Sequence, residues 1–267
     1  MLGKLIKYDL SSVSRILLPL HGFLILITLM GKGLIMLSRS ITFPDLLIVL
    51  MILLYVLYAA AVSIVTIVLL IYSFYRSMFS NEGYLTFTLP VSENSLLLSK
   101  TIVAWIWGTL NVLILFGCIG ILVYQRGLFG DIFSLIGMAQ DCFMQEFGVN
   151  ALGRAIPFVL LTILTGIPMC LIPIYMCFAI GQLFNQHKVA FSFVAFFALS
   201  VIKQILGFVA MFLLSLMDVE EIFYLETVEA INWFTAYAYI SLGISILATL
   251  IMYFVTLTII KKKLNLA

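Results

Sequence analysis

Long apolar runs separated by short polar connections make up most of this chain. Six of these runs have the length needed to cross about 30 Å of hydrocarbon as a helix. They cover about residues 16–37, 46–75, 101–124, 155–183, 189–217 and 234–260. The pattern predicts an all-α membrane protein with six transmembrane helices.

Two further stretches are amphipathic rather than uniformly apolar. In the first, the residues at helical spacing are Leu2, Leu5, Ile6, Leu10, Val13 and Leu17, with Lys4, Lys7 and Arg15 on other faces. This pattern favours an interfacial N-terminal helix, either an elbow that steadies the first span beside a partner or a plain topology anchor. The second stretch, 128–147, has an apolar face and a polar side. It is expected to lie on the outer leaflet, to cap the bundle or to be a helical loop.

Composition supports a lipid environment for most of the chain. The 267 residues are 64% hydrophobic and 10% charged, against about 25% charged in an average soluble domain. A small globular fold leaves much of its surface in water, so it could not hide this much apolar surface.

The distribution of Lys and Arg predicts the orientation. With a cytoplasmic N-terminus, the inner side carries Lys4, Lys7, Arg15, Arg76, Lys100, Lys188, Lys261, Lys262 and Lys263. The outer side carries Arg39, Arg126 and Arg154, with Lys32 near a helix end, and the loop between the last two spans is acidic. We therefore expect both termini in the cytoplasm and a multi-pass protein of the plasma membrane.

No catalytic or nucleotide-binding motif occurs in the sequence. HExxH, G-x-S-x-G and G-x-x-x-x-G-K-[ST] are all missing. Glu220–Glu221 resembles the double glutamate of intramembrane CAAX-type proteases, but no Arg follows at the required spacing. Cys170 and Cys177 are seven residues apart without a His or carboxylate to complete a metal site. We expect no enzyme activity, no metal, no cofactor bound by this chain and no nucleic-acid partner.

One charge falls within an apolar run. Lys203, followed by Gln204, lies near the centre of the fifth span, where a lysine costs about 2.5 to 3.5 kcal/mol. It is predicted to line a pathway that meets a polar or anionic group. Alternatively it bonds backbone carbonyls and polar groups such as Asn111. The two histidines, His21 and His187, are expected to be structural.

The connection between the second and third spans is more apolar than a solvated loop. It reads NEGYLTFTLPVSENSLLLSK from Asn81 to Lys100. A short helix is predicted over 82–88 and is stopped by Pro90, and Ser92 is a suitable cap for the next helix. Exposed Tyr84 and Phe87 would form an apolar patch typical of a protein-binding surface.

With this loop, the chain resembles the permease subunits of ABC-2 type ATP-binding cassette (ABC) transporters of Gram-positive bacteria. The resemblance covers the whole chain: the amphipathic start MLGKLIKYDL, six spans with both ends inside, and the loop EGYLTFTLPVS…LLLSK. The chain differs at Glu93, where family members often carry a basic residue.

The resemblance implies a single transmembrane permease domain over 1–267 and a coupling helix that docks on a separate ATPase subunit. The docking residues would be Glu82, Gly83, Tyr84, Leu85, Thr86, Phe87 and Thr88, with the helix break at Leu89 and Pro90. A second ATPase contact would fall in the loop Gly181 to Lys188, at Asn185, Gln186, His187 and Lys188.

The implied assembly has two permeases, identical or sister subunits, and two ATPases that bind ATP and Mg. Export of amphipathic or apolar cargo, such as a peptide or drug, is the expected direction. Two alternatives remain open. One is a non-transporting sensor or immunity protein that binds a partner through the 81–90 loop, and the other is a proton-coupled transporter centred on Lys203.

Overall fold

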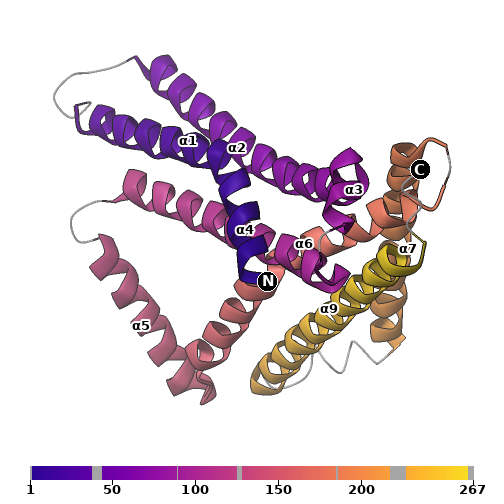
Figure 1. The fold of residues 1–267 in the computed structure, drawn as a ribbon. Helices are drawn as coiled ribbons and strands as arrows, with labels where there is room; N and C mark the ends of the chain where they lie inside the picture. The colour runs from indigo at the N-terminus through magenta and orange to yellow at the C-terminus, as the bar shows by residue number, and fades with distance from the viewer. Residues whose placement is uncertain are drawn as a thin grey trace. The chain divides into compact units, whose positions relative to one another are not determined.

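Helices account for all the regular secondary structure in the part of the chain that the structure describes. This computed structural model describes residues 2–37, 44–88, 90–124, 128–184, 186–216 and 227–263. The helices are α1 (Leu2–Leu37), α2 (Asp45–Phe79), α3 (Asn81–Phe87), α4 (Glu93–Val123), α5 (Leu128–Phe147), α6 (Ala151–Gly181), α7 (Lys188–Leu216) and α9 (Thr227–Lys263) (Figure 1). Six of them, all except α3 and α5, are long and apolar enough to cross a membrane. The predicted all-α protein with six such helices is confirmed, while the side that each end faces stays a prediction.

Each of the spanning helices begins before the apolar run that predicts it. α4 begins at Glu93, eight residues before the predicted start, because Ser92 caps it: the Ser92 hydroxyl accepts a hydrogen bond from the backbone N–H of Ser95 at 3.4 Å. The predicted Ser92 cap is therefore confirmed. At the other end of α4, Lys32 donates from Nζ to the carbonyl oxygens of Leu122, at 3.1 Å, and Tyr124. A lysine near a helix end satisfies its last carbonyl groups in this way.

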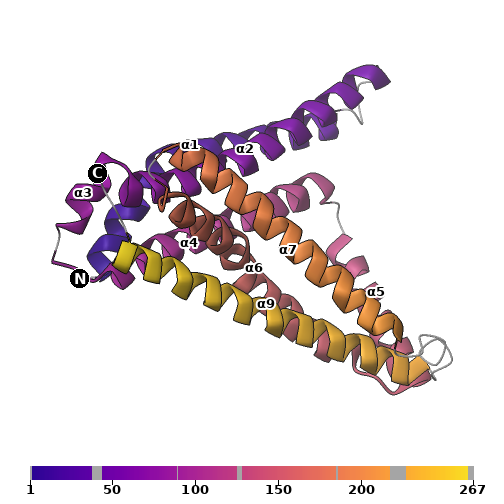
Figure 2. The same cartoon turned by 90° about the vertical axis from the view of Figure 1, so that its right-hand side faces the viewer.

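α1 joins the predicted amphipathic stretch and the first predicted span in one helix of 36 residues. At about 1.5 Å per residue it is far longer than the hydrocarbon layer. The helix bends part-way along (Figures 1 and 2). Pro19 lies inside it and lacks the N–H that would bond the carbonyl of Arg15, a common cause of a bend.

The chain divides into two compact units, residues 1–129 and 130–267. The prediction of a single domain over 1–267 stays a prediction. Most of the acidic loop, with Asp218, Glu220, Glu221 and Glu226, lies outside the described residues, as does the predicted end of the fifth span at 217.

In the first unit, α1 packs on both α4 and α2. Each of its polar contacts with α4 reaches a residue 90 to 92 positions later: Asp9 pairs with Lys100, His21 with Asn111 and Lys32 with Leu122 and Tyr124. This constant offset means that α1 and α4 run parallel. α2 runs antiparallel to them, because Tyr55 contacts Thr28 and Tyr58 contacts Leu20.

The second unit is centred on α6, which packs against both α7 and α9 and lies between them in Figure 2. Arg154 and Phe158, near the start of α6, contact Asn232 and Tyr239, near the start of α9. α6 and α9 are therefore parallel, and each unit has the alternating helix directions that consecutive membrane crossings require. α5 coincides with the predicted second amphipathic stretch, and nearly all of its described side chains are exposed.

Candidate functional site

The segment after α2 folds into the short helix α3, close to the predicted 82–88. Ser80 separates the two helices: its hydroxyl accepts a hydrogen bond from the backbone N–H of Glu82 at 3.3 Å and donates to the carbonyl oxygen of Arg76. At the other end, Pro90 lies in the bend that leads to α4, while Leu89 of the predicted helix break lies outside the described residues. The helix itself is present, and its coupling role stays a prediction.

Gly83 holds α3 close to the end of α2. It is buried, and a Cβ atom built on it would lie 2.7 Å from the carbonyl oxygen of Met78 and 2.9 Å from its carbonyl carbon. Real Cβ atoms do not approach backbone so closely, so a glycine is required for this contact. Among the predicted docking residues, Gly83 therefore acts by letting the two backbones meet.

Glu82 forms an ion pair with Arg76, at the end of α2. The Arg76 Nε donates to Glu82 Oε1 at 2.8 Å, and Nη2 donates to the same oxygen. Both side chains are about half exposed, at 53% and 51%, so solvent screens the attraction between them. The carboxylate is thus engaged within the chain and orients α3 on α2.

The surface of α3 is apolar at Leu85, which is 67% exposed and also lines the cavity described below. Phe87 is half-buried, and the side chain of Tyr84 lies outside the described residues. The hydroxyls of Thr86 and Thr88 donate to the carbonyls of Glu82 and Leu85, both at 2.8 Å, so both are satisfied within α3. Among the described side chains of α3, the exposed large apolar one is therefore Leu85, whereas Phe87, which was predicted to be exposed, is half-buried.

A buried ion pair lies beside α3. Lys100 Nζ, on α4, donates to Asp9 Oδ1, on α1, at 2.5 Å, and Ser99 Oγ lies 3.0 Å from Asp9 Oδ2. The two charged side chains are 10% and 8% exposed. Burial of both charges strengthens their attraction and makes the loss of either one costly. The pair fastens the N-terminal turns of α1 to the start of α4.

This pair was not predicted, although the sequence contains a signal for it. Asp9 lies four residues before Val13 and eight before Leu17, so it falls on the apolar stripe of the N-terminal helix. Asp9, Val13 and Leu17 are indeed buried on one face of α1. A carboxylate on such a stripe indicates a buried cationic partner. The sequence alone does not identify that partner, because Lys100 is 91 residues away.

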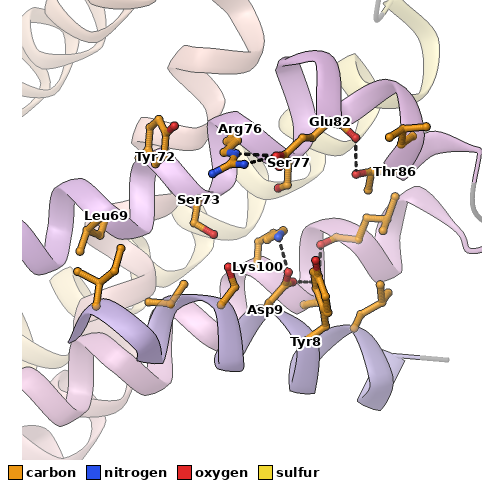
Figure 3. Close-up of a pocket in the computed structure, with 17 residues that line it drawn as sticks. Tyr8, Asp9, Leu69, Tyr72, Ser73, Arg76, Ser77, Glu82, Thr86 and Lys100 are labelled. Atoms are coloured by element: carbon orange, nitrogen blue, oxygen red, sulfur yellow. Dashed lines mark hydrogen bonds and ion pairs between the residues drawn. The ribbon is translucent and has the colours of Figure 1, made fainter. Parts of the chain in front are cut away.

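A cavity of about 590 Å³ opens between the first turns of α1 and the last turns of α2. Figure 3 shows the Asp9–Lys100 pair on the side of α4, with the Arg76–Glu82 pair between α2 and α3. Hydroxyl groups line its middle, at Tyr8, Ser12, Tyr72, Ser73 and Ser77. The cavity belongs wholly to the first unit.

The predicted second ATPase contact lies in the turn between α6 and α7. Gly181 ends α6 so close to α7 that a Cβ atom on it would lie 2.6 Å from the carbonyl oxygen of Lys188. Phe184 stacks on Phe191 at 3.9 Å, and His187 has a positive φ of 53°. Gln186 and His187 are exposed and Lys188 begins α7, whereas Asn185 lies outside the described residues. These residues form a tight turn whose surface is polar at Gln186 and His187 and apolar at Leu183 and Phe184.

The pathway candidates have different environments. Asn111 is buried, and its side-chain oxygen lies 3.1 Å from His21 Nε2, while His21 Nδ1 donates to the Leu17 carbonyl at 2.8 Å. This arrangement joins α1 to α4 and fits the structural role expected for His21. Lys203 and Gln204 are exposed on α7, and their pathway role stays a prediction.

Among the described residues, no three His, Cys, Asp or Glu side chains come together in a way that could hold a metal ion. Comparison with protein-family models, with curated proteins and with solved structures found no match.

Proposed function

We propose that this protein is the membrane-spanning permease subunit of an ABC-2 type ABC transporter, in which α3 docks on a separate ATPase subunit. The observation that carries the proposal is the surface of α3: a seven-residue helix directly after a span-like helix, with Leu85 exposed. Single exposed apolar side chains are ordinary on a protein surface, so Leu85 supports the proposal through its place in the loop that resembles a coupling helix.

Several contacts suit α3 to transmit movement. Gly83 brings its backbone against Met78, and Glu82 pairs with Arg76. A push on Leu85 would therefore move the end of α2 rather than bend a free loop. ATP binding on the partner subunits would draw them together, and this motion would shift the spans between inward and outward openings.

The rest of the proposed assembly follows from the resemblance in sequence. A second permease, either another copy or a sister chain, would complete the pathway, and the ATPases would bind ATP and Mg. Apolar residues dominate the spans, which suits export of amphipathic or apolar cargo across the plasma membrane with both termini in the cytoplasm.

We expect Leu85→Asp to remove the partner ATPase while leaving the chain folded. Leu85 is exposed, so the substitution would alter a docking surface without opening a core. The protein would be purified in mild detergent from its native membranes, and co-purifying polypeptides would be photolabelled with azido-ATP. We expect at least about a tenfold loss of the labelled band, as for a central interface anchor.

The matched control is Leu135→Asp. Leu135 is 64% exposed on α5 and lies four residues after Asp131 on the polar side of that helix. It should keep the labelled band. The proposal fails if no ATP-binding polypeptide accompanies the wild-type protein, the outcome expected of a sensor or immunity protein, or if Leu85→Asp keeps it in full.

A charge swap between Glu82 and Arg76 tests whether Glu82 acts by holding α3 on α2 or by contacting the ATPase directly. We expect Glu82→Lys to uncouple ATP hydrolysis from cargo movement in reconstituted vesicles, because it places two cations side by side and releases α3 from α2. Adding Arg76→Glu should restore at least about half of the coupling, since the pair re-forms with its charges exchanged. If the double variant stays uncoupled, the carboxylate itself contacts the ATPase and the role assigned to the pair is wrong.

A further inference from the structure

Along α2, the lining of the cavity beside α3 changes from apolar to charged, while Leu5, Leu85 and Leu96 also line it. Leu69 on α2 and Ile16 on α1 lie at its apolar end, followed by the hydroxyls of Tyr72 and Ser73 and then by Arg76. Seven residues of helix separate Leu69 from Arg76, a rise of about 10 Å. A bilayer makes the same change over the roughly 5 to 8 Å between its hydrocarbon and the outer edge of its headgroups.

Two ion pairs supply the charges that line the cavity, and the cation of one of them is accessible to an anion. Asp9 and Lys100 neutralise each other and are buried. Arg76 is half exposed and bonds Glu82 through Nε and Nη2, which leaves the two N–H groups of Nη1 outside these bonds.

The size and the access of the cavity suit a small amphipathic group. Its volume of about 590 Å³ is within the usual range of ligand pockets, roughly 300 to 1,000 Å³. Tyr8 and Tyr72 line it and are 77% and 54% exposed, so the cavity opens to its surroundings. Ile16 is also 50% exposed, and it offers an apolar surface beside the opening.

We propose that this cavity binds the headgroup of an anionic phospholipid, with the phosphate at Arg76, the glycerol among the hydroxyls of Tyr72 and Ser73, and the acyl chains leaving past Ile16 and Leu69. Pockets between spanning helices that present a cation recognise anionic lipid headgroups in this way. The apolar end favours a lipid over a free phosphate ion, which would leave Ile16 and Leu69 without a partner.

Glu82 links lipid binding to the contact between α2 and α3, a link that a simple basic patch would lack. Its carboxylate lines the cavity and competes with the lipid phosphate for Arg76. Bound lipid would draw the guanidinium away from Glu82 and loosen the hold of α2 on α3. The lipid site follows from the cavity alone and does not require an ATPase partner.

The test uses the full chain purified in detergent, with bound lipid counted by native mass spectrometry. Dioctanoyl phosphatidylglycerol is titrated against dioctanoyl phosphatidylcholine, inorganic phosphate and glycerol phosphate. We expect phosphatidylglycerol to bind at least about fivefold more tightly than phosphatidylcholine, and the two water-soluble phosphates to compete weakly. Equal binding of both lipids would overturn the proposal, and so would competition by inorganic phosphate at the concentration of the lipid.

Two variants at the ion pair should change affinity in opposite directions. Arg76→Gln should weaken phosphatidylglycerol binding about fivefold because the phosphate loses its cation, and Glu82→Gln should tighten it about fivefold because the competitor is removed. If the pair only holds the fold, both variants weaken binding to the same extent and the proposal is wrong.

A third variant fills the cavity. Ser73→Trp should lower phosphatidylglycerol retention by at least about tenfold, with Ser200→Trp on the exposed surface of α7 as the matched control. Full retention by Ser73→Trp would overturn the proposal, as would an equal loss in Ser200→Trp. If Ser73→Trp does not fold, the proposal is tested by the opposite changes in phosphatidylglycerol affinity expected for Arg76→Gln and Glu82→Gln.

Discussion

Asp9→Ala is expected to lower the free energy of unfolding by about 3 to 5 kcal/mol, the cost of leaving a buried charge without its partner. Lys100 is about 10% exposed, and its ammonium group is bonded to Asp9. Without the carboxylate, the ammonium must either stay buried and unpaired or lose its proton. Unfolding in mixed detergent micelles, followed by circular dichroism, would measure the change.

The double variant Asp9→Leu with Lys100→Met tests whether the loss of stability comes from an unpaired charge or from the loss of side-chain volume at this position. Replacing both charges by apolar groups of similar volume removes the desolvation cost together with the attraction, so the double variant should lie within about 1 kcal/mol of the wild type. Asp131→Ala, on the exposed surface of α5, should change stability by no more than about 0.5 kcal/mol. A loss below about 1 kcal/mol for Asp9→Ala would mean that Lys100 reaches water and that the pair is not a buried clamp.

The Asp9–Lys100 pair fixes the N-terminal turns of α1 against α4, a position that the sequence alone does not indicate. The apolar residues at helical spacing predict a helix that lies at the interface, and they give no preference between a partner-facing elbow and a topology anchor. Instead, the buried side of that stripe at Asp9, Val13 and Leu17 faces the interior of the first unit. Tyr8 and Ser12, on the neighbouring face of α1, line the cavity.

Local signals explain what could be predicted. The lengths of the apolar runs predict six spanning helices, because the thickness of the hydrocarbon layer sets that length. The short helix α3 follows from the apolar residues before Pro90 and from the stop at that proline. The start of α4 follows from the cap at Ser92. In each case the signal lies within a short stretch of sequence, so it can be read without knowing how the helices pack.

Contacts between distant residues explain what could not be predicted. The pairs Asp9–Lys100 and His21–Asn111 are 91 and 90 residues apart. Their register depends on how α1 and α4 pack, which hydropathy does not encode. The cavity was missed for the same reason, since three helices and the start of α4 each contribute only part of it. Glu82 was predicted as a docking residue from its place in the loop, while its bond to Arg76 gives it a role inside the chain.

Gly181→Ala is expected to destabilise the second unit by about 1 to 3 kcal/mol, the usual cost of forcing an extra carbon into a packed site. A Cβ atom at this position would lie 2.0 Å from Ser192 Oγ, 2.6 Å from the Lys188 carbonyl oxygen and 2.9 Å from the Ser192 backbone nitrogen. The hydroxyl can rotate away, but the backbone of α7 cannot move without opening the turn. Thermal unfolding in detergent would measure the loss.

Two variants make the result specific to this close contact. Gly166→Ala places the same methyl group on the same helix, where no atom lies within 4 Å, so it should be neutral or stabilise α6 by about 0.5 to 1 kcal/mol. Adding Ser192→Ala to Gly181→Ala removes the nearest atom but leaves the Lys188 carbonyl, so the rescue should be partial. If Gly181→Ala is as stable as Gly166→Ala, α6 and α7 do not approach this closely. The turn that carries His187 and Lys188 would then not be held as rigidly as a second ATPase contact requires.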